Sequence, residues 1–231
     1  MSGNERKVLV EKVYNDLKSM ILNGTFKPGE KLFQEHLAEL LGVSRTPLLK
    51  AFQILEQEMF LESIPRRGMY VRSLSMKDLI NTFECRQAIE TTAVRILSGI
   101  ITREEASSLQ AIFSPFINMK VIDNELYLKA DTIFHQRLVN MSRNNYLIKM
   151  NRMANIQNLT YRGGLLREAA ETLPEHLMII SALETKDSGL AEEYMRNHLR
   201  KTINAIQEKI SNEQKSLSLV EDQSGSVKSV K

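Results

Sequence analysis

Four residues in the second half of the chain have side chains suited to binding a divalent metal ion. Asp131 and His135 are four positions apart, so in a helix they lie one turn apart on the same face. His176 and His198 belong to two later segments. One carboxylate and three imidazoles suit zinc or nickel, with manganese and iron as further options, and an octahedral shell would leave positions for water or a carboxylate ligand. These four residues are the candidate metal ligands.

The spacing alone leaves other interpretations open. An aspartate followed four residues later by a histidine is frequent by chance, and scattered histidines are more often packed or hydrogen-bonded than bound to metal. A metal-dependent hydrolase could also use the same four residues to hold a metal-bound water. No obvious general base lies at motif spacing from them. The sequence does not show whether the segments that carry the histidines converge.

Helices are expected to carry these residues, because the chain from residue 75 onward has helical periodicity. Two capping boxes, Ser75-x-x-Asp78 and Thr102-x-x-Glu105, predict two helix starts. Later helices are predicted to start at Asp123, Asn145, Pro174 and Ser188. The helix from Asn145 is expected to reach Gly163-Gly164. We therefore predict an all-helical bundle domain over residues 75–211.

Arg86 is expected to point into this helical domain, because it lies on the apolar stripe of its helix. A buried guanidinium needs a partner. Glu90, one turn further on, is one candidate. The carboxylate of a bound organic acid is the other, since the planar guanidinium suits it well. Asn144 and Arg162 are further candidates for the same pocket.

Residues 32–56 predict a helix-turn-helix. The first helix has leucines at helical spacing and ends at Gly42, because glycine accepts the positive φ of a tight helix exit. Ser44 can cap the second helix through its side-chain oxygen, and Pro47 is tolerated in the first helical turn. An ordinary helical hairpin is the alternative interpretation.

The second helix of such a motif enters the DNA major groove with its N-terminal residues leading. Arg45 and Thr46 lie at that leading end, where they would contact bases. Ser44 and Lys50 would contact phosphates. These four residues are therefore the candidate DNA-binding residues of the second helix.

Two short apolar runs after this motif flank Pro65-Arg66-Arg67-Gly68 and predict a β-hairpin. A helix-turn-helix followed directly by a hairpin is a winged helix. A basic hairpin tip is more often merely solvated than functional, but its place after a recognition helix favours a DNA contact. Arg66, Arg67 and Gly68 are thus the candidate wing residues, and residues 1–74 are the predicted DNA-binding domain.

Composition bounds the class of protein. The 231 residues are 42% hydrophobic, which is typical of a globular chain, and no run approaches 18 apolar residues, so no membrane span is expected. The one cysteine, Cys85, excludes an intrachain disulfide and fits a reducing, cytoplasmic location. The net charge is only +3, so any DNA contact must come from a local basic patch. Residues 212–231 are rich in polar residues without helical period and are predicted to be disordered.

These motifs resemble the GntR family of bacterial transcription regulators. The matching residues are Pro28-Gly-Glu-Lys-Leu32, the run from Leu37-Ala-Glu to Ser44-Arg-Thr-Pro47, and Pro65-x-x-Gly68-x-x-Val71. The later part resembles the helical ligand-sensing domain of the FadR type, known as FCD. Its matching residues include Arg86-x-x-x-Glu90, Asp131-x-x-Phe-His135, Glu175-His176 and His198-Leu199. The resemblance covers roughly residues 7–210.

The resemblance implies a function and a ligand set. Metal-binding members of the group place Asp and His one turn apart with two later histidines, and Asp131, His135, His176 and His198 fill these positions. The family commonly has Arg and Glu where this chain has Leu49-Lys50, so the resemblance does not predict the operator sequence, and Lys50 indicates either a phosphate contact or a shifted base preference.

We therefore expect a non-enzymatic transcription regulator, with repression as the commoner outcome in the family. It would bind as a homodimer to a near-palindromic DNA operator and respond to a small organic acid. The alternatives are the metal hydrolase and a winged helix that docks protein.

Overall fold

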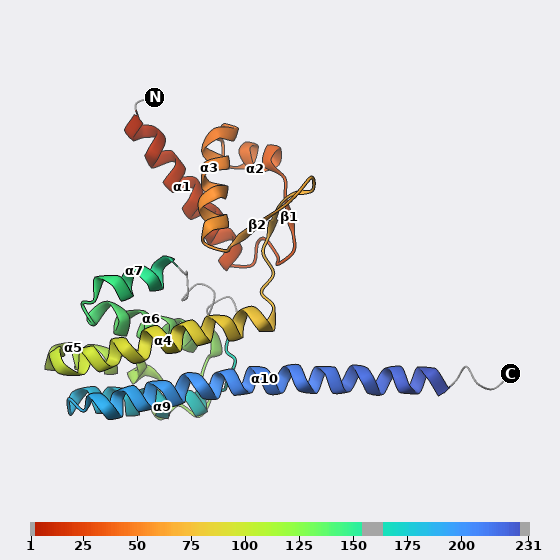
Figure 1. Cartoon of the computed structure of the whole chain (residues 1–231). Coiled ribbons are helices and arrows are strands. Elements are labelled where there is room, and N and C mark those ends of the chain that lie inside the picture. Colours follow the sequence, from red (N-terminus) through yellow and green to blue (C-terminus); the bar gives the residue numbers. More distant parts are fainter. Residues whose placement is uncertain (1–2, 154–163, 227–231) are drawn as a thin grey trace. The chain divides into compact units, whose positions relative to one another are not determined.

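A computed structural model describes residues 3–153 and 164–226 (Figure 1). The chain divides into two compact units, with the division between Leu74 and Ser75. None of the described helices is long and apolar enough to cross a membrane.

The first unit is a winged helix. Its helices are α1 (Gly3–Leu22), α2 (Gln34–Leu40) and α3 (Arg45–Gln57), and its strands are β1 (Lys31–Leu32), β2 (Leu61–Ile64) and β3 (Gly68–Val71). The predicted helix-turn-helix is α2–α3, and the predicted hairpin is β2–β3. The two-residue strand β1 was not predicted. It pairs antiparallel with β3, so the sheet order is β1-β3-β2.

A single apolar core holds the first unit together. The apolar stripe of α3 contributes Leu48, Ala51, Phe52 and Leu55, none of which has measurable exposure. The same core takes apolar side chains from α1, α2 and the strands. Because this one face of α3 is buried, its opposite face is left to solvent.

The second unit is all-helical, as predicted. Its helices are α4 (Met76–Ile100), α5 (Arg103–Phe113), the short 3-10 helix η1 (Ser114–Phe116), α6 (Asn124–Met141), α7 (Asn145–Met153), α9 (Ala169–Glu184) and α10 (Ser188–Ser226). The long helices α4 and α10 lie side by side (Figure 1). Between the helices lie buried aromatic side chains, including Phe113, Tyr127 and Phe134.

The predicted helix starts are mostly confirmed by hydrogen bonds. Both capping boxes form, at Ser75 with Asp78 and at Thr102 with Glu105. Asp123 caps α6 by accepting a hydrogen bond from Leu126 N at 2.9 Å.

Two helix boundaries differ from the prediction. The helix predicted to start at Pro174 starts at Ala169, and the proline lies inside its second turn. There it removes one backbone donor without ending the helix. Helix α7 is described only to Met153, so its predicted extent to Gly163 lies outside the described residues.

The last helix is longer than predicted. Helix α10 continues to Ser226, through most of the segment 212–231 for which composition predicts disorder. The segment contains Glu, Gln, Lys and Leu, which have good helix propensity, and extending an existing helix avoids the cost of nucleation. The structure therefore corrects the prediction for residues 212–226. Composition alone does not predict this helix, because it describes the segment apart from the helix that precedes it.

We predict that Phe52→Ala destabilises the winged helix by about 3–5 kcal/mol, because the ring has no exposed surface and its removal leaves a cavity. Urea denaturation followed by hydrogen-exchange mass spectrometry of residues 1–74 measures the effect. Gln53→Ala, at the neighbouring exposed position, is the control and should be within about 0.5 kcal/mol of the wild type. Equal stability of the two variants would contradict the assignment of this core.

Candidate functional site

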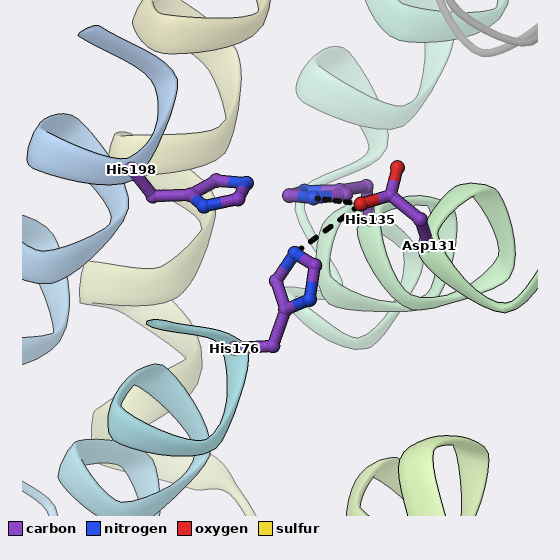
Figure 2. A group of neighbouring side chains, drawn as sticks. All are labelled: Asp131, His135, His176 and His198. Carbon is purple, nitrogen blue, oxygen red and sulfur yellow. Dashed lines mark ion pairs between the residues drawn. The ribbon is translucent and has the colours of Figure 1, made fainter. Parts of the chain in front are cut away.

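The four candidate metal ligands come together in the second unit (Figure 2). Asp131 and His135 come from α6, His176 from α9 and His198 from α10. One ligand atom from each residue lies within 4.8 Å of the others. Asp131 Oδ1 is 3.6 Å from His135 Nε2 and 3.3 Å from His176 Nε2. The convergence of three helices, which the sequence could not show, is present in the structure.

The Nδ1 atom of each of these histidines has its own partner. His135 Nδ1 lies 2.6 Å from Glu90 Oε2, and His198 Nδ1 lies 2.8 Å from Glu175 Oε2. Because an ionised carboxylate only accepts hydrogen bonds, both Nδ1 atoms must carry the proton and donate. That tautomer leaves the Nε2 lone pair of a neutral ring free for a metal ion.

His176 reaches the same arrangement through hydroxyl groups. Its Nδ1 is 3.1 Å from Tyr127 Oη, which is 2.9 Å from Thr172 Oγ1. Thr172 Oγ1 in turn donates to the Glu168 carbonyl oxygen at 3.4 Å. A chain of donors from His176 Nδ1 through Tyr127 and Thr172 satisfies every group when Nε2 is unprotonated. Tyr127, Asp131 and His135 lie at successive i, i+4 positions of α6, a spacing from which the role of Tyr127 could have been predicted.

The Nε2 atoms fit a metal ion. Those of His135 and His176 are buried and make no hydrogen bond of standard geometry among the described residues, and Asp131 Oδ1 lies 3.6 and 3.3 Å from them. Buried polar atoms are rarely left without a partner, so two such atoms beside one carboxylate indicate a position for a cation. The donor set of one carboxylate and three imidazoles is one that zinc and nickel accept.

Electrostatics favours a cation at the centre of the cluster. Burial lowers the pKa of His198 to about 3 and also lowers the pKa of His176, so both rings are neutral near pH 7. Burial acts in the same direction on His135, but the carboxylates of Glu90 and Asp131 outweigh it and raise its pKa. A positive charge is therefore favoured between His135 and Asp131, where a metal ion can replace the proton.

Arg86 is buried, as predicted, and pairs with Glu90. Arg86 Nε lies 2.8 Å from Glu90 Oε1, and the guanidinium lies over the Phe83 ring at 4.6 Å from its centroid. Burial alone raises the pKa of Glu90, but Arg86 and His135 lower it to about 2. Arg86 Nη2 has no hydrogen-bond partner among the described residues. Arg86 thus fixes the Glu90 carboxylate, which in turn fixes His135. Its Nη2 atom remains a buried donor that could bind a ligand.

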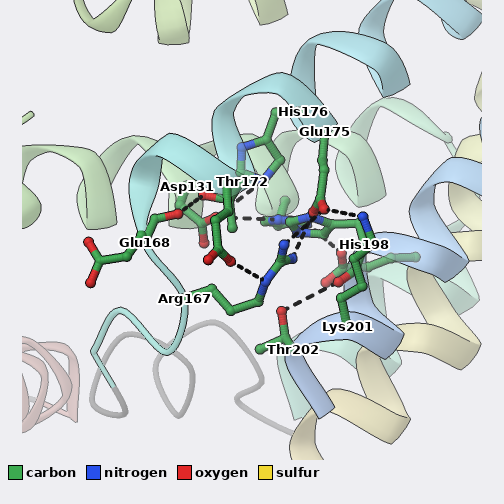
Figure 3. Close-up of polar contacts among 12 residues, drawn as sticks. Asp131, Arg167, Glu168, Thr172, Glu175, His176, His198, Lys201 and Thr202 are labelled. Carbon is green, nitrogen blue, oxygen red and sulfur yellow. Dashed lines mark hydrogen bonds and ion pairs between the residues drawn. The ribbon is translucent and has the colours of Figure 1, made fainter. Parts of the chain in front are cut away.

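Glu175 is the centre of a second network (Figure 3). Arg167 donates to both of its oxygens, at 2.7 and 2.9 Å, and Lys201 Nζ donates to Oε1 at 2.7 Å. Burial alone raises the pKa of Glu175, but hydrogen bonds from His198, Arg167 and Lys201 lower it strongly. Glu175 is therefore an ionised, well-anchored acceptor for His198. No sequence pattern predicts the roles of Glu175 and Arg167, because contacts between separate segments of the chain leave no spacing signal.

A small cavity of about 30 Å³ lies beside the cluster. Its volume is enough for about two water molecules. The polar residues that line it are Arg86, Asp131, Arg167, Thr172, His198 and Thr202. The cavity thus joins two arginines to two of the candidate metal ligands.

The other predicted pocket residues have different outcomes. Asn144 caps α7, since its Oδ1 accepts hydrogen bonds from Tyr146 N at 3.1 Å and Leu147 N at 3.2 Å. Its side-chain oxygen is therefore engaged in helix capping. Arg162 lies outside the described residues.

The candidate DNA-binding residues of α3 lie toward one end of the helix. Ser44, Arg45, Thr46 and Lys50 are all exposed at or near the N-terminal end of the helix. Ser44 occupies the N-cap position, but its side chain makes no capping hydrogen bond, contrary to the expectation. Its hydroxyl is therefore available to another acceptor or donor.

The wing tip has an unusual backbone. Arg67 N donates to the Ile64 carbonyl oxygen at 3.0 Å, with Pro65 and Arg66 at the two central positions of the turn. Arg66 has a φ of 64°. Proline followed by a positive φ is the pattern of a type II turn, which favours glycine at that second position. Gly68 follows with a φ of 107° and starts β3. Arg66 and Arg67 are both exposed.

Comparison with known families identifies both units. Residues 9–71 match the family described as bacterial regulatory proteins, gntR family, and residues 81–201 match the FCD domain. The chain belongs to the GntR family of transcription regulators. The first unit is therefore the DNA-binding domain of a GntR regulator, and the second is its FCD domain.

Individual GntR relatives agree with this assignment. The chain is 32% identical to YdhC, an uncharacterised HTH-type transcriptional regulator of Bacillus subtilis, over 80% of this chain and 85% of the relative. It is 30% identical to the Nta operon transcriptional regulator of Aminobacter aminovorans, over 82% and 90% of the two chains. Sequence relatedness therefore extends through both domains.

Solved structures show the same fold. A GntR regulator from Rhodococcus sp. RHA1 has a TM-score of 0.72 at 21% identity and covers 86% of this chain and 97% of its own. McbR/YncC of E. coli has a TM-score of 0.65 at 22% identity, over 87% and 98% of the two chains.

We predict that Glu175→Gln lowers the affinity of this GntR protein for zinc or nickel by about tenfold or more. A neutral amide is a weaker acceptor for His198 Nδ1, and partners of metal-binding histidines typically contribute this much to affinity. Competition with a chelator measures the dissociation constant. Glu171→Gln is the control, because Glu171 pairs with the same Arg167 at 3.2 Å from a more exposed position. The role of Glu175 would be refuted by equal affinities of the two variants.

Proposed function

We propose that this GntR protein is a homodimeric, sequence-specific regulator whose DNA affinity responds to a small organic acid bound beside a metal ion in the FCD domain. The observation that carries the proposal is the buried Asp131/His135/His176/His198 cluster, which opens onto a cavity lined by Arg86. Repression is the proposed outcome. Among the relatives, the gluconate operon regulator of Bacillus licheniformis is named as a transcriptional repressor.

DNA binding is assigned to the exposed end of α3 and the wing. Arg45 and Thr46 would contact bases in the major groove, and Ser44 and Lys50 would contact phosphates. The wing residues Arg66, Arg67 and Gly68 would lie against the backbone or the minor groove. A homodimer would place two such helices about one DNA turn apart on a near-palindromic operator.

The metal is assigned a role in ligand binding. Asp131, His135, His176 and His198 would hold zinc or nickel, or alternatively manganese or iron, and the metal would supply a Lewis-acidic position for a ligand oxygen. Glu90, Tyr127 and Glu175 hold the imidazoles in the required tautomer. The alternative is a metal-dependent hydrolase. It is disfavoured because the carboxylates closest to the histidines, Glu90 and Glu175, are both held by arginines and serve as hydrogen-bond acceptors.

The ligand is proposed to be a small carboxylate. Arg86 Nη2 is a buried donor without a partner among the described residues, and the cavity beside it has room for only a few atoms. Arg86 would therefore clamp a carboxylate while its Nε keeps Glu90 in place. Such a ligand changes DNA affinity only through its differential affinity for the DNA-competent and DNA-incompetent forms of the dimer. The ligand's affinity would depend on the metal and on DNA.

In a gel-shift assay at one fixed salt concentration, we predict that the wild-type protein binds DNA from its own upstream region. Arg45→Ala should lower the affinity of this sequence-specific binding by about tenfold or more. Loss of one bidentate base contact removes about 1–3 kcal/mol of discrimination at each half-site. Because Arg45 is exposed, the substitution should leave the fold intact, and circular dichroism checks this. Specific binding that survives in Arg45→Ala would overturn the assignment of α3 as the recognition helix.

Carboxylate binding in the FCD domain should depend on the metal ion. Thermal-shift measurements should show that zinc or nickel raises the melting temperature, and that a small carboxylate raises it further only when metal is present. Arg86→Lys should keep the metal shift and lose the carboxylate shift, because lysine retains the charge but not the planar fork. If no carboxylate in a broad screen acts on metal-loaded protein, the proposed ligand class is wrong.

A further inference from the structure

An ion pair links the two helices of the helix-turn-helix at the DNA-facing end. Arg45, the first residue of α3, donates through Nη2 to Oε1 of Glu35 in the first turn of α2. Both side chains are open to solvent, with exposed fractions of 65% for Arg45 and 82% for Glu35. The pair therefore lies on the surface that is assigned to DNA.

The pair has no evident role in folding. Ion pairs between solvent-exposed side chains contribute little to stability, because solvent screens them and two long side chains lose freedom. A carboxylate beside a DNA-binding surface also repels phosphates, so Glu35 works against the affinity for DNA in general. A residue that contributes little to the fold beyond its place in the first turn of α2, and that does not attract DNA, is suited to a third role, which is to control what Arg45 contacts.

The rest of α3 makes Arg45 unusually important for base recognition. It is the only arginine of the helix, and arginine is the side chain that most often reads guanine, through its O6 and N7 atoms. One turn further on lies Leu49, which is 41% exposed and has no polar atom in its side chain. Discrimination by α3 therefore depends mainly on its first turn.

We propose that Glu35 is a specificity-determining residue, which orients Arg45 toward a guanine edge and away from the phosphate backbone. This inference rests on the proposed function of α3 as the recognition helix. With one Nη2 hydrogen directed at Glu35, the remaining guanidinium N–H groups still present two parallel donors for a bidentate contact. The carboxylate restricts the rotamers of Arg45 before binding, so less conformational freedom is lost on a guanine contact.

The carboxylate also disfavours the wrong contact. An Arg45 side chain that turned to a phosphate would leave Glu35 unpaired in the strong negative field of the DNA. On a guanine, by contrast, the ion pair is retained while the arginine is desolvated. The net effect is lower affinity for DNA of arbitrary sequence and a larger preference for the operator.

The experiment compares three variants of the full-length protein. A binding site is first selected from a pool of random double-stranded DNA with the wild-type protein. Dissociation constants are then measured at one salt concentration for the selected site, for the same site with each guanine replaced by 7-deazaguanine, and for a scrambled duplex. The variants are Glu35→Gln, Glu39→Gln and Arg45→Ala. Glu39 is the matched control, because it is exposed on the same helix one turn further on and its substitution changes the net charge equally.

Glu35→Gln should bind scrambled DNA a few-fold more tightly, and its preference for the selected site should fall about fivefold or more. Its sensitivity to the critical 7-deazaguanine should fall in parallel. Glu39→Gln should bind all duplexes more tightly but keep the wild-type preference.

Two results separate failure of this inference from failure of the proposed function. If Arg45→Ala loses the preference while Glu35→Gln keeps it like Glu39→Gln, the role of Glu35 is refuted and the recognition helix stands. If Arg45→Ala keeps the wild-type preference, or the wild type selects no sequence, the recognition helix itself is refuted and the inference falls with it.

Discussion

A buried imidazole has two nitrogen atoms, and both need partners. In the FCD domain of this protein, His135 and His176 have protein hydrogen-bond partners at only one of their two nitrogen atoms. Glu90, Tyr127 and Glu175 take the Nδ1 atoms, and the Nε2 atoms of His135 and His176 are left facing one carboxylate. The partners come from α4, α6 and α9, so the same contacts that orient the rings also tie the helices together. The hydrogen bonds that satisfy the buried imidazoles are therefore also contacts that hold the helices of this domain together.

Local rules in the sequence anticipated the parts of the fold that depend on neighbouring residues. Both capping boxes, the Asp123 cap, the exit of α2 through Gly42 with its φ of 63°, and the wing turn follow from residues within a few positions of one another. The candidate ligands were also identifiable, but through the family resemblance. Spacing alone connected only Asp131 with His135. Their meeting with His176 and His198 depends on how α6, α9 and α10 pack, which no local pattern contains.

Residues that act through a partner in another segment of the fold were the hardest to predict. Glu175 precedes a candidate ligand in the chain yet serves a different one, His198, 23 positions later. Arg167 reaches Glu175 across the start of α9. The pairing of Arg45 with Glu35 was not predicted from the sequence for the same reason, since it joins two helices across a turn. In each case the side chains belong to different elements, and only the tertiary structure brings their charges within contact distance.

The wing tip keeps a charged residue at a position where glycine would be more stable. Arg66 holds a φ of 64°, a conformation that glycine adopts freely and that costs a residue with a Cβ atom on the order of 1 kcal/mol. Glycine at this position would relax the turn but remove one of the two guanidinium groups at the tip. A search for a more heat-resistant version of this protein would therefore favour a substitution here, at the expense of the positive charge that a wing presents to DNA. Thermostability is for this reason a poor guide to the fitness of the DNA-binding domain.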